Sequence, residues 1–135
     1  MENAFAHLFS SGFERGLLIG SDIPDLPHEL IEEAFSALDE KDAVIGPASD
    51  GGYFLIGFRH STFLRDIFRG IAWSTGSVYR ETMEIFEKAG YRVHVLHEWS
   101  DVDTIDDLRS LYRRNRNTSF RDSLTMSCCR ELFHD

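Results

Sequence analysis

The stretch Leu17-Leu18-Ile19-Gly20-Ser21-Asp22-Ile23-Pro24-Asp25-Leu26-Pro27 decides the fold, because a short apolar run ends in a carboxylate and two prolines prevent the strand from continuing. A helical pattern then begins at His28. The order is strand, tight turn and helix, and in an open α/β sheet ligands bind outside the carboxyl ends of such strands. A carboxylate at Asp22 can therefore face a ligand or a metal ion. The alternative is that Asp22 or Asp25 only caps the following helix.

Strand and helix patterns alternate on both sides of this stretch. Three consecutive apolar residues in the strand 16–20 favour a central, parallel strand that is buried on both faces, whereas the strand 91–96 alternates in part and is expected nearer an edge. Thr104 is a suitable N-cap, with Asp107 in a near match to a capping box. Helices are expected before Gly12 and over 28–38, within 59–70, over 77–89 and after Thr104, and further strands are expected over 43–46 and 53–58.

Length and charge limit the classes of function. The 135 residues fit one domain, and a net charge of -9 argues against a nucleic-acid-binding surface, which would be basic. No apolar run approaches the roughly 20 residues of a membrane-spanning helix, and Met1–Gly12 lacks the features of a signal peptide, so we expect a cytoplasmic protein. Cys128 and Cys129 are adjacent, a poor geometry for an ordinary disulfide, and are interpreted as free thiols.

Three acidic loops follow three of the expected strands. They contain Asp22, Asp50 and the pair Asp101 and Asp103. If the first and last strands were neighbours in a parallel sheet, Asp22 and Asp103 would converge at its carboxyl edge, and such oxygen ligands suit Mg²⁺ or Mn²⁺. Spacing alone does not establish this site, because Asp is also common at turns and caps.

Two further motifs have both a structural and a functional interpretation. Asp50-Gly51-Gly52-Tyr53 is a hairpin turn, or a loop whose glycines let a substrate approach while Tyr53 stacks on a ring or donates a hydrogen bond. Trp73-Ser74-Thr75 resembles a loop that contacts a sugar or a phosphate, but a buried Trp followed by an N-cap explains it as well, and we favour that explanation.

Four motifs in this order resemble the bacterial nucleotide-diphospho-sugar transferase-like proteins of glycosyltransferase-A fold. They are residues 19–26, 46–57, 73–75 and 101–108, and the resemblance runs from about Met1 to Leu111. It implies a Rossmann-like three-layer α/β/α sandwich with a mostly parallel sheet. It also implies a metal-dependent transferase that moves a glycosyl or nucleotidyl group from a nucleotide-sugar to a small-molecule acceptor.

The resemblance also implies roles for particular residues. Asp22 and Asp50 are the catalytic candidates, and Asp22 and Asp103 would hold Mg²⁺ or Mn²⁺ near the diphosphate. The residues expected to contact substrate are Ser21, Gly51, Gly52, Tyr53, Trp73, Ser74 and Thr75.

The chain departs from this family at its start. The strand and the glycine- and basic-rich loop that hold the nucleotide phosphates do not precede Met1, so the fold is expected to be incomplete: 1–112 would be the C-terminal part of the domain, and 113–135 a mobile tail or a short helix. A half-sheet exposes a strand edge, which predicts a homo-oligomer. The alternative function is an inactive binding or assembly module that keeps the fold without the nucleotide pocket. A phosphatase-like domain with Asp22 as nucleophile is weaker, since no partner motif accompanies it.

Overall fold

The alternation of strands and helices is present in a computed structural model, which describes residues 1–73 and 75–133. The α-helices are α1 (Glu2–Ser10), α2 (His28–Ala37), α3 (Val78–Lys88), α4 (Ile105–Arg114) and α5 (Leu124–Phe133). The strands are β1 (Arg15–Ile19), β2 (Ala43–Pro47), β3 (Tyr53–Arg59) and β4 (Val93–Val95), and 3-10 turns are η1 (His60–Thr62), η2 (Arg65–Phe68) and η3 (Ser119–Asp122).

The described strands form one sheet with the order β1-β3-β2-β4. Strand β3 runs antiparallel to both of its neighbours, whereas β2 and β4 are parallel. The sheet is therefore mixed, which corrects the expectation of a mostly parallel sheet. The cause is the short turn between β2 and β3, which allows a hairpin but is too short for the crossover that parallel strands need.

Strand β1 lies at an edge of the sheet and pairs antiparallel with β3, so the expectation of a central parallel strand was wrong. Its consecutive apolar residues have a different cause, because helices cover both faces at this edge. The side chain of Leu8 lies so close to Gly16 that a Cβ there would collide with it, and Leu17 packs with the α2 side of the core. Burial on two faces gives the same sequence pattern in an edge strand as in a central one. Strand β4 does lie at the opposite edge, as predicted.

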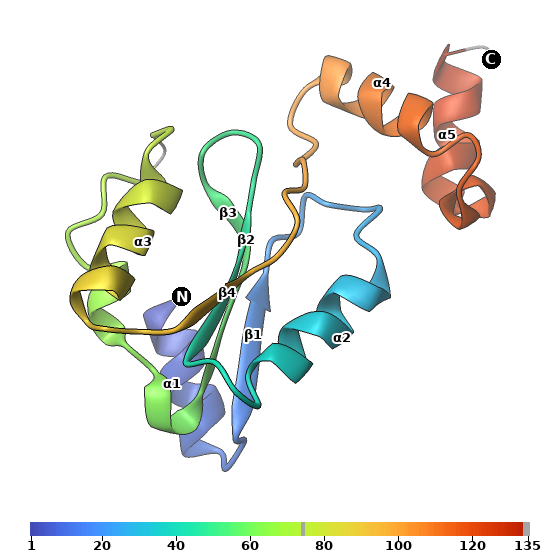
Figure 1. Cartoon of the computed structure of the whole chain (residues 1–135). Helices are drawn as coiled ribbons and strands as arrows, with labels where there is room; N and C mark the ends of the chain where they lie inside the picture. Colours follow the sequence, from blue (N-terminus) through green and yellow to red (C-terminus); the bar gives the residue numbers. More distant parts are fainter. Residues whose placement is uncertain (74, 134–135) are drawn as a thin grey trace.

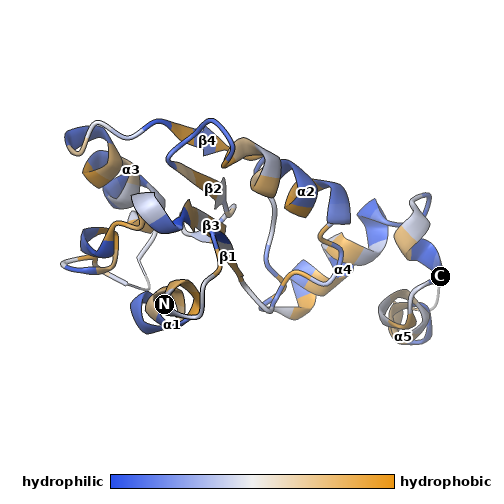
Figure 2. Cartoon of the chain, turned by 90° about the horizontal axis from the view of Figure 1, so that it is seen from below, coloured by the Kyte–Doolittle hydropathy of each residue, from blue (hydrophilic) through white to orange (hydrophobic). Residues whose placement is uncertain are grey.

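The core has two parts, one on each face of the sheet. On one face, aromatic residues of α1 and α3, including Phe5 and Phe86, pack on Ile45, Ile56 and Phe58. On the other face, α2 contributes its buried residues to a cluster with Val44, Leu55 and Leu96. Figure 2 shows α1 and α3 on one side of the strands and α2 on the other.

The last two helices form an additional small unit. Helix α5 packs on α4 through a cluster that includes Leu111, Tyr112, Met126 and Cys129. This pair lies beyond the end of the sheet at which the loop after β1 is found (Figure 1). The segment after residue 112 thus contains η3 and α5, and both cysteines are free thiols, as predicted. Within the described residues, no helix combines the length and apolar character required to cross a bilayer.

Candidate functional site

The acidic loops meet through the extended segment that follows β4. Strands β1 and β4 lie at opposite edges of the sheet, so the condition under which Asp22 and Asp103 would converge, that the first and last strands are neighbours, is not met. Instead, the chain after β4 crosses back over the end of the sheet (Figure 1). The Ser49 N–H donates to the Trp99 carbonyl at 3.1 Å, and the Val102 N–H donates to the Asp22 carbonyl at 2.8 Å. This crossing places the Asp101–Asp103 loop between the loops after β1 and β2.

Three carboxylates converge at this point: Asp50, Asp101 and Asp103. One potential ligand oxygen of each lies within 4.8 Å of the other two. We call these three residues the carboxylate group. Oxygen donors in this arrangement are the ligands preferred by Mg²⁺ and Mn²⁺. Asp50 and Asp103 were candidates from the sequence, whereas Asp101 was not selected.

Asp101 is the member of the carboxylate group with the least favourable surroundings for a negative charge. Burial raises the pKa of its carboxyl, and the charges of Asp50, Asp103 and Asp22 raise it further. Its Oδ1 atom is buried and accepts no hydrogen bond from the described part of the chain. A buried acceptor without a donor is costly, and a cation would both satisfy that oxygen and reduce the repulsion among the carboxylates.

The other two acidic residues nearby have different positions. Asp22 lies beside the carboxylate group through its carbonyl contact with Val102, but its carboxylate is not one of the three that converge, and Ser21 Oγ lies 3.4 Å from it. Asp107 accepts the backbone N–H groups of Asp103 and Thr104 at 3.0 and 3.1 Å, and these bonds lower its pKa. The capping box predicted at Thr104 is confirmed, and it fixes the loop that carries Asp103.

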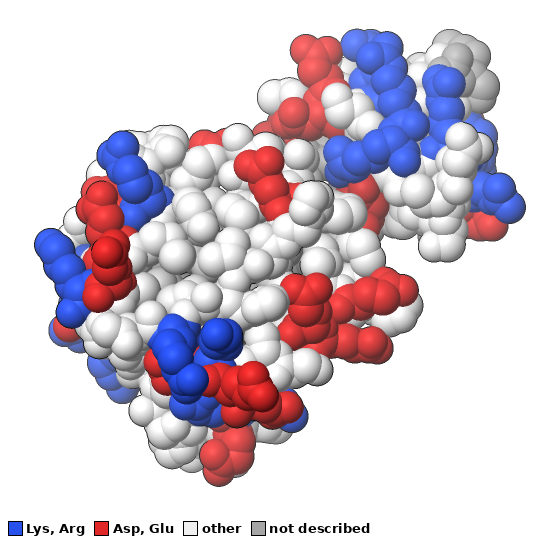
Figure 3. Space-filling model, viewed as in Figure 1, with Lys and Arg blue, Asp and Glu red and all other residues white. Residues whose placement is uncertain are grey.

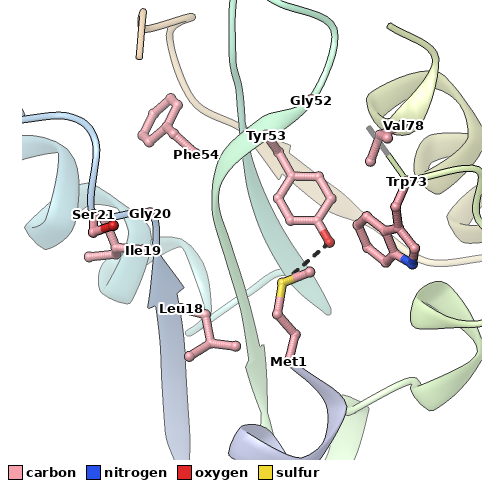
Figure 4. Close-up of a pocket in the computed structure, with 10 residues that line it drawn as sticks. All are labelled: Met1, Leu18, Ile19, Gly20, Ser21, Gly52, Tyr53, Phe54, Trp73 and Val78. Atoms are coloured by element: carbon pink, nitrogen blue, oxygen red, sulfur yellow. Dashed lines mark hydrogen bonds between the residues drawn. The ribbon is translucent and has the colours of Figure 1, made fainter. Parts of the chain in front are cut away.

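A cavity of about 470 Å³ lies next to the carboxylate group. The two are linked by the turn between β2 and β3, because Asp50 Oδ1 accepts the Gly52 N–H at 2.9 Å and Gly52 lines the cavity. Figure 4 shows Tyr53 and Trp73 on one side of this cavity and Ser21 on the other. The remaining lining residues are Met1, Leu18, Ile19, Gly20, Phe54 and Val78.

Two aromatic side chains, Tyr53 and Trp73, line the cavity. Trp73 is 43% exposed and lies edge-on to the Tyr53 ring, with the ring centroids 6.5 Å apart. The favoured interpretation of Trp73 as a buried core residue was therefore wrong. Burial raises the pKa of the Tyr53 hydroxyl well above its ordinary value of 10, so this group is a hydrogen-bond donor at physiological pH. Its partner is the Met1 sulfur at 3.7 Å, a weak acceptor.

Two other predicted contact residues, Gly51 and Thr75, are not among the residues that line this cavity. Gly51 is held against the backbone of Gly76, with no room for a Cβ. Thr75 donates its hydroxyl to the Ala72 carbonyl at 2.7 Å, so it supports the loop and is not among the residues that line the cavity. Ser74 lies outside the described residues.

One signal in the sequence could have identified Asp101. In extended backbone, residues i and i+2 point to the same side, so an Asp-x-Asp pattern places two carboxylates on one face. These residues were predicted as a loop between the strand 91–96 and the helix after Thr104, and only Asp103 was selected from it as a metal ligand.

Comparisons with known proteins agree with the resemblance found in the motifs. The profile of the family described as "Uncharacterized protein conserved in bacteria (DUF2064)" matches residues 1–75. A crystal structure from Desulfovibrio desulfuricans G20, described as a "putative nucleotide-diphospho-sugar transferase", is 48% identical, with a TM-score of 0.96 over 99% of this chain. The chain spans 58% of the length of that protein. No curated protein matches the chain.

Proposed function

Since the chain belongs to the bacterial family DUF2064, we propose that it takes part in metal-dependent transfer of a glycosyl or nucleotidyl group from a nucleotide-sugar. The similarity to the D. desulfuricans protein supports a transferase of this general kind. The observation that carries the proposal is the convergence of Asp50, Asp101 and Asp103 beside a cavity with exposed aromatic side chains.

The carboxylate group fits a divalent cation. Burial and the neighbouring carboxylates disfavour the charged form of Asp101, and its Oδ1 accepts no hydrogen bond from the described residues. Mg²⁺ or Mn²⁺ bound here would neutralise a diphosphate and stabilise the charge on a leaving phosphate. Asp50 and Asp103, which are exposed, and Asp101, which is partly buried, would be the protein ligands.

The cavity residues would bind and orient the substrate. Trp73 offers an exposed ring face for stacking, and the Tyr53 hydroxyl can exchange its weak sulfur partner for a substrate oxygen. Asp22 lies beside the carboxylate group without belonging to it, so its carboxylate can accept a hydrogen bond from a substrate hydroxyl.

The test is a calorimetric titration with uridine-, guanosine- and cytidine-linked diphospho-sugars, with and without Mn²⁺. We expect one class of donor to bind only when Mn²⁺ is present. Replacing Trp73 by Ala should weaken that binding by up to about tenfold through the loss of ring stacking. Phe13→Ala is the matched control, because Phe13 is an exposed aromatic residue outside the cavity lining.

Two results would contradict the proposal. If the donor binds equally strongly without Mn²⁺, the proposal that the function depends on the metal is contradicted. Saturation with Mn²⁺ without binding of any of the three donors would remove nucleotide-sugars as the substrate of this chain.

A further inference from the structure

Positive charge is concentrated in one segment of an otherwise acidic chain, from the middle of α4 into α5. Residues 109–130 contain six arginines and one aspartate, while the whole chain carries a net charge of -9. Figure 3 shows arginine side chains, in blue, gathered over α4 and α5 on the face in view. The metal-dependent function proposed above uses none of these arginines.

Three of the arginines surround a hollow of about 370 Å³. Its lining residues are Arg116, Arg121 and Arg130, together with Tyr112 and Met126. We call it the arginine hollow. Tyr112 and Met126 are 3% and 1% exposed, so they form a buried apolar part, while the three arginines are exposed. The arginines come from three segments: the chain after α4, η3, and α5.

Contacts within the protein hold these side chains in place. The Arg116 guanidinium lies 5.1 Å from the centre of the Tyr112 ring, in a cation–π arrangement. Arg130 Nη1 donates to the Arg121 carbonyl at 2.9 Å, which leaves other N–H groups of that guanidinium for a ligand. Arg121 Nε is 3.9 Å from the Asp122 carboxylate, a long contact between two exposed side chains. Such a contact contributes little free energy.

Three arginine side chains that line one hollow create a positive potential there, which favours the binding of an anion. A phosphate group suits this arrangement, since its oxygens accept paired hydrogen bonds from the planar guanidinium and its charge is spread over several oxygens. We propose that the arginine hollow is a binding site for a phosphate-bearing anion, either a phosphate monoester or a diphosphate.

This site is separate from the carboxylate group. The carboxylate group adjoins the start of α4, whereas Arg116 follows its end, and the ten residues of α4 span about 15 Å. A single diphosphate cannot bridge that distance. The anion in the arginine hollow is therefore a second ligand, or a distant part of a larger one.

Two sources could supply the phosphate. A soluble phosphate ester would enter the hollow from solution. An anionic lipid headgroup would bring a bilayer close to α5, where Leu124 and Leu132 are 87% and 52% exposed. The chemistry recognised is the same, so the experiment has to separate the sources.

The experiment is a titration of the full chain with inorganic pyrophosphate, followed by calorimetry in the presence of a chelator that removes divalent cations. We expect saturable binding that weakens as salt is added. Arg121→Gln and Arg130→Gln should each weaken it about tenfold, since each removes a charge-assisted contact. Arg121→Lys should retain part of the affinity, because the charge remains and the planar fork is lost.

Two controls make the result specific. Arg92→Gln removes an exposed arginine far from the hollow and should leave pyrophosphate binding unchanged. Asp103→Asn should also leave pyrophosphate binding unchanged, so the experiment tests the arginine hollow independently of the proposed metal site. A parallel measurement with phosphatidylcholine vesicles, with and without phosphatidic acid, whose headgroup is a phosphate monoester, identifies the source: binding that requires phosphatidic acid and is lost in Arg130→Gln indicates a lipid headgroup. Absence of pyrophosphate binding, or equal binding by wild type, Arg121→Gln and Arg130→Gln, would overturn the proposal.

Discussion

At the scale of single residues, Asp25 connects three parts of the chain. Its side chain is 1% exposed and accepts hydrogen bonds from Trp99 Nε1 at 3.0 Å, Arg114 Nε at 2.7 Å and Asn115 Nδ2 at 2.8 Å. Burial alone would raise the pKa of Asp25, but these three partners outweigh it and hold the pKa below its ordinary value. Helix α2 begins after Pro27 without a side-chain cap, so the interpretation of Asp25 as a helix cap was wrong.

Replacing Asp25 by Ala should be strongly destabilising. It leaves Arg114 with an uncompensated charge and the partly buried Trp99 Nε1 without its acceptor, and it removes one of the two acceptors of Asn115 Nδ2, whose other acceptor is the Leu111 carbonyl. We expect a loss of about 3 kcal/mol or more in the free energy of unfolding. Urea unfolding followed by circular dichroism measures it. Asp122→Ala, which removes an 85% exposed carboxylate, is the control and should change the stability by less than about 0.5 kcal/mol. A similar small change for Asp25→Ala would show that the contact is dispensable.

Asp101 should make the stability depend on pH in the opposite direction to Asp25, because the pKa of Asp101 is raised and that of Asp25 is lowered. Its pKa is raised above the ordinary 3.8 in the folded chain, so the folded state binds the proton more tightly than the unfolded state. Without metal, stability should therefore fall as pH rises from about 4 through the raised pKa. Asp101→Asn should remove this fall and be more stable than wild type at neutral pH, by about 1 kcal/mol or less because solvent screens the group. Chemical unfolding in chelator at several pH values tests this, and identical pH profiles for the two proteins would contradict it.

At the scale of elements, apolar periodicity predicted the helices α1 and α2, because it depends on local spacing. The residues at the start of α4 predicted its capping box, because that motif consists of local hydrogen bonds. Strand order was not predictable in the same way. The β2–β3 hairpin is local and its turn was predicted, but the pairing of β1 with β3 and the crossing of residues 96–103 depend on contacts between distant segments, which leave no periodic trace in either segment. The same holds for the site. Asp50 and Asp103 were predicted because they lie in loops that follow strands, but which carboxylates converge depends on the crossing of residues 96–103.

The turn between β2 and β3 gives an element-scale prediction. Gly51 has φ +94°, and a Cβ there would overlap the backbone of Gly76, while the Gly51 carbonyl accepts the Tyr79 N–H at 2.8 Å. Gly51→Ala should therefore cost about 2 kcal/mol or more and displace the start of α3. Gly70→Ala is the control, because Gly70 has φ +70° but open space around it, so only the backbone cost of about 1 kcal/mol applies. Equal losses of stability in Gly51→Ala and Gly70→Ala, measured by thermal unfolding, would show that the close approach of Gly51 to Gly76 does not add to the cost of the substitution.

At the scale of the whole molecule, the outer edge of β1 is available for pairing. The Glu14 carbonyl accepts the N–H of His60, directly after β3, and the Gly20 N–H donates to the Phe54 carbonyl of β3. In the alternating antiparallel ladder, the backbone groups of Arg15, Leu17 and Ile19 therefore point away from β3. No further strand covers that side within the described residues. Such an edge is a template for another strand, which supports the proposal that two copies associate through β1.

Light scattering across a range of protein concentrations tests this association. We expect a dimer whose population falls in Ile19→Lys, because a charge at a 40% exposed edge position opposes strand pairing. Leu124→Lys introduces the same charge at an exposed apolar position on α5 and should leave the dimer intact. A monomer at every concentration would contradict the proposal.

The carboxylate group is the centre of the functional account, and binding of Mn²⁺ tests it most directly. Electron paramagnetic resonance counts free Mn²⁺ as the ion is added to wild type and variants. Asp101→Asn and Asp103→Asn should each weaken the affinity by more than the 10–100-fold typical of losing a partner outside the ligand shell. Asp106→Asn, which removes an 85% exposed carboxylate from the same end of α4, should bind like wild type. Wild type that leaves all Mn²⁺ free, or that binds it with the same affinity as Asp101→Asn and Asp103→Asn, would contradict the account.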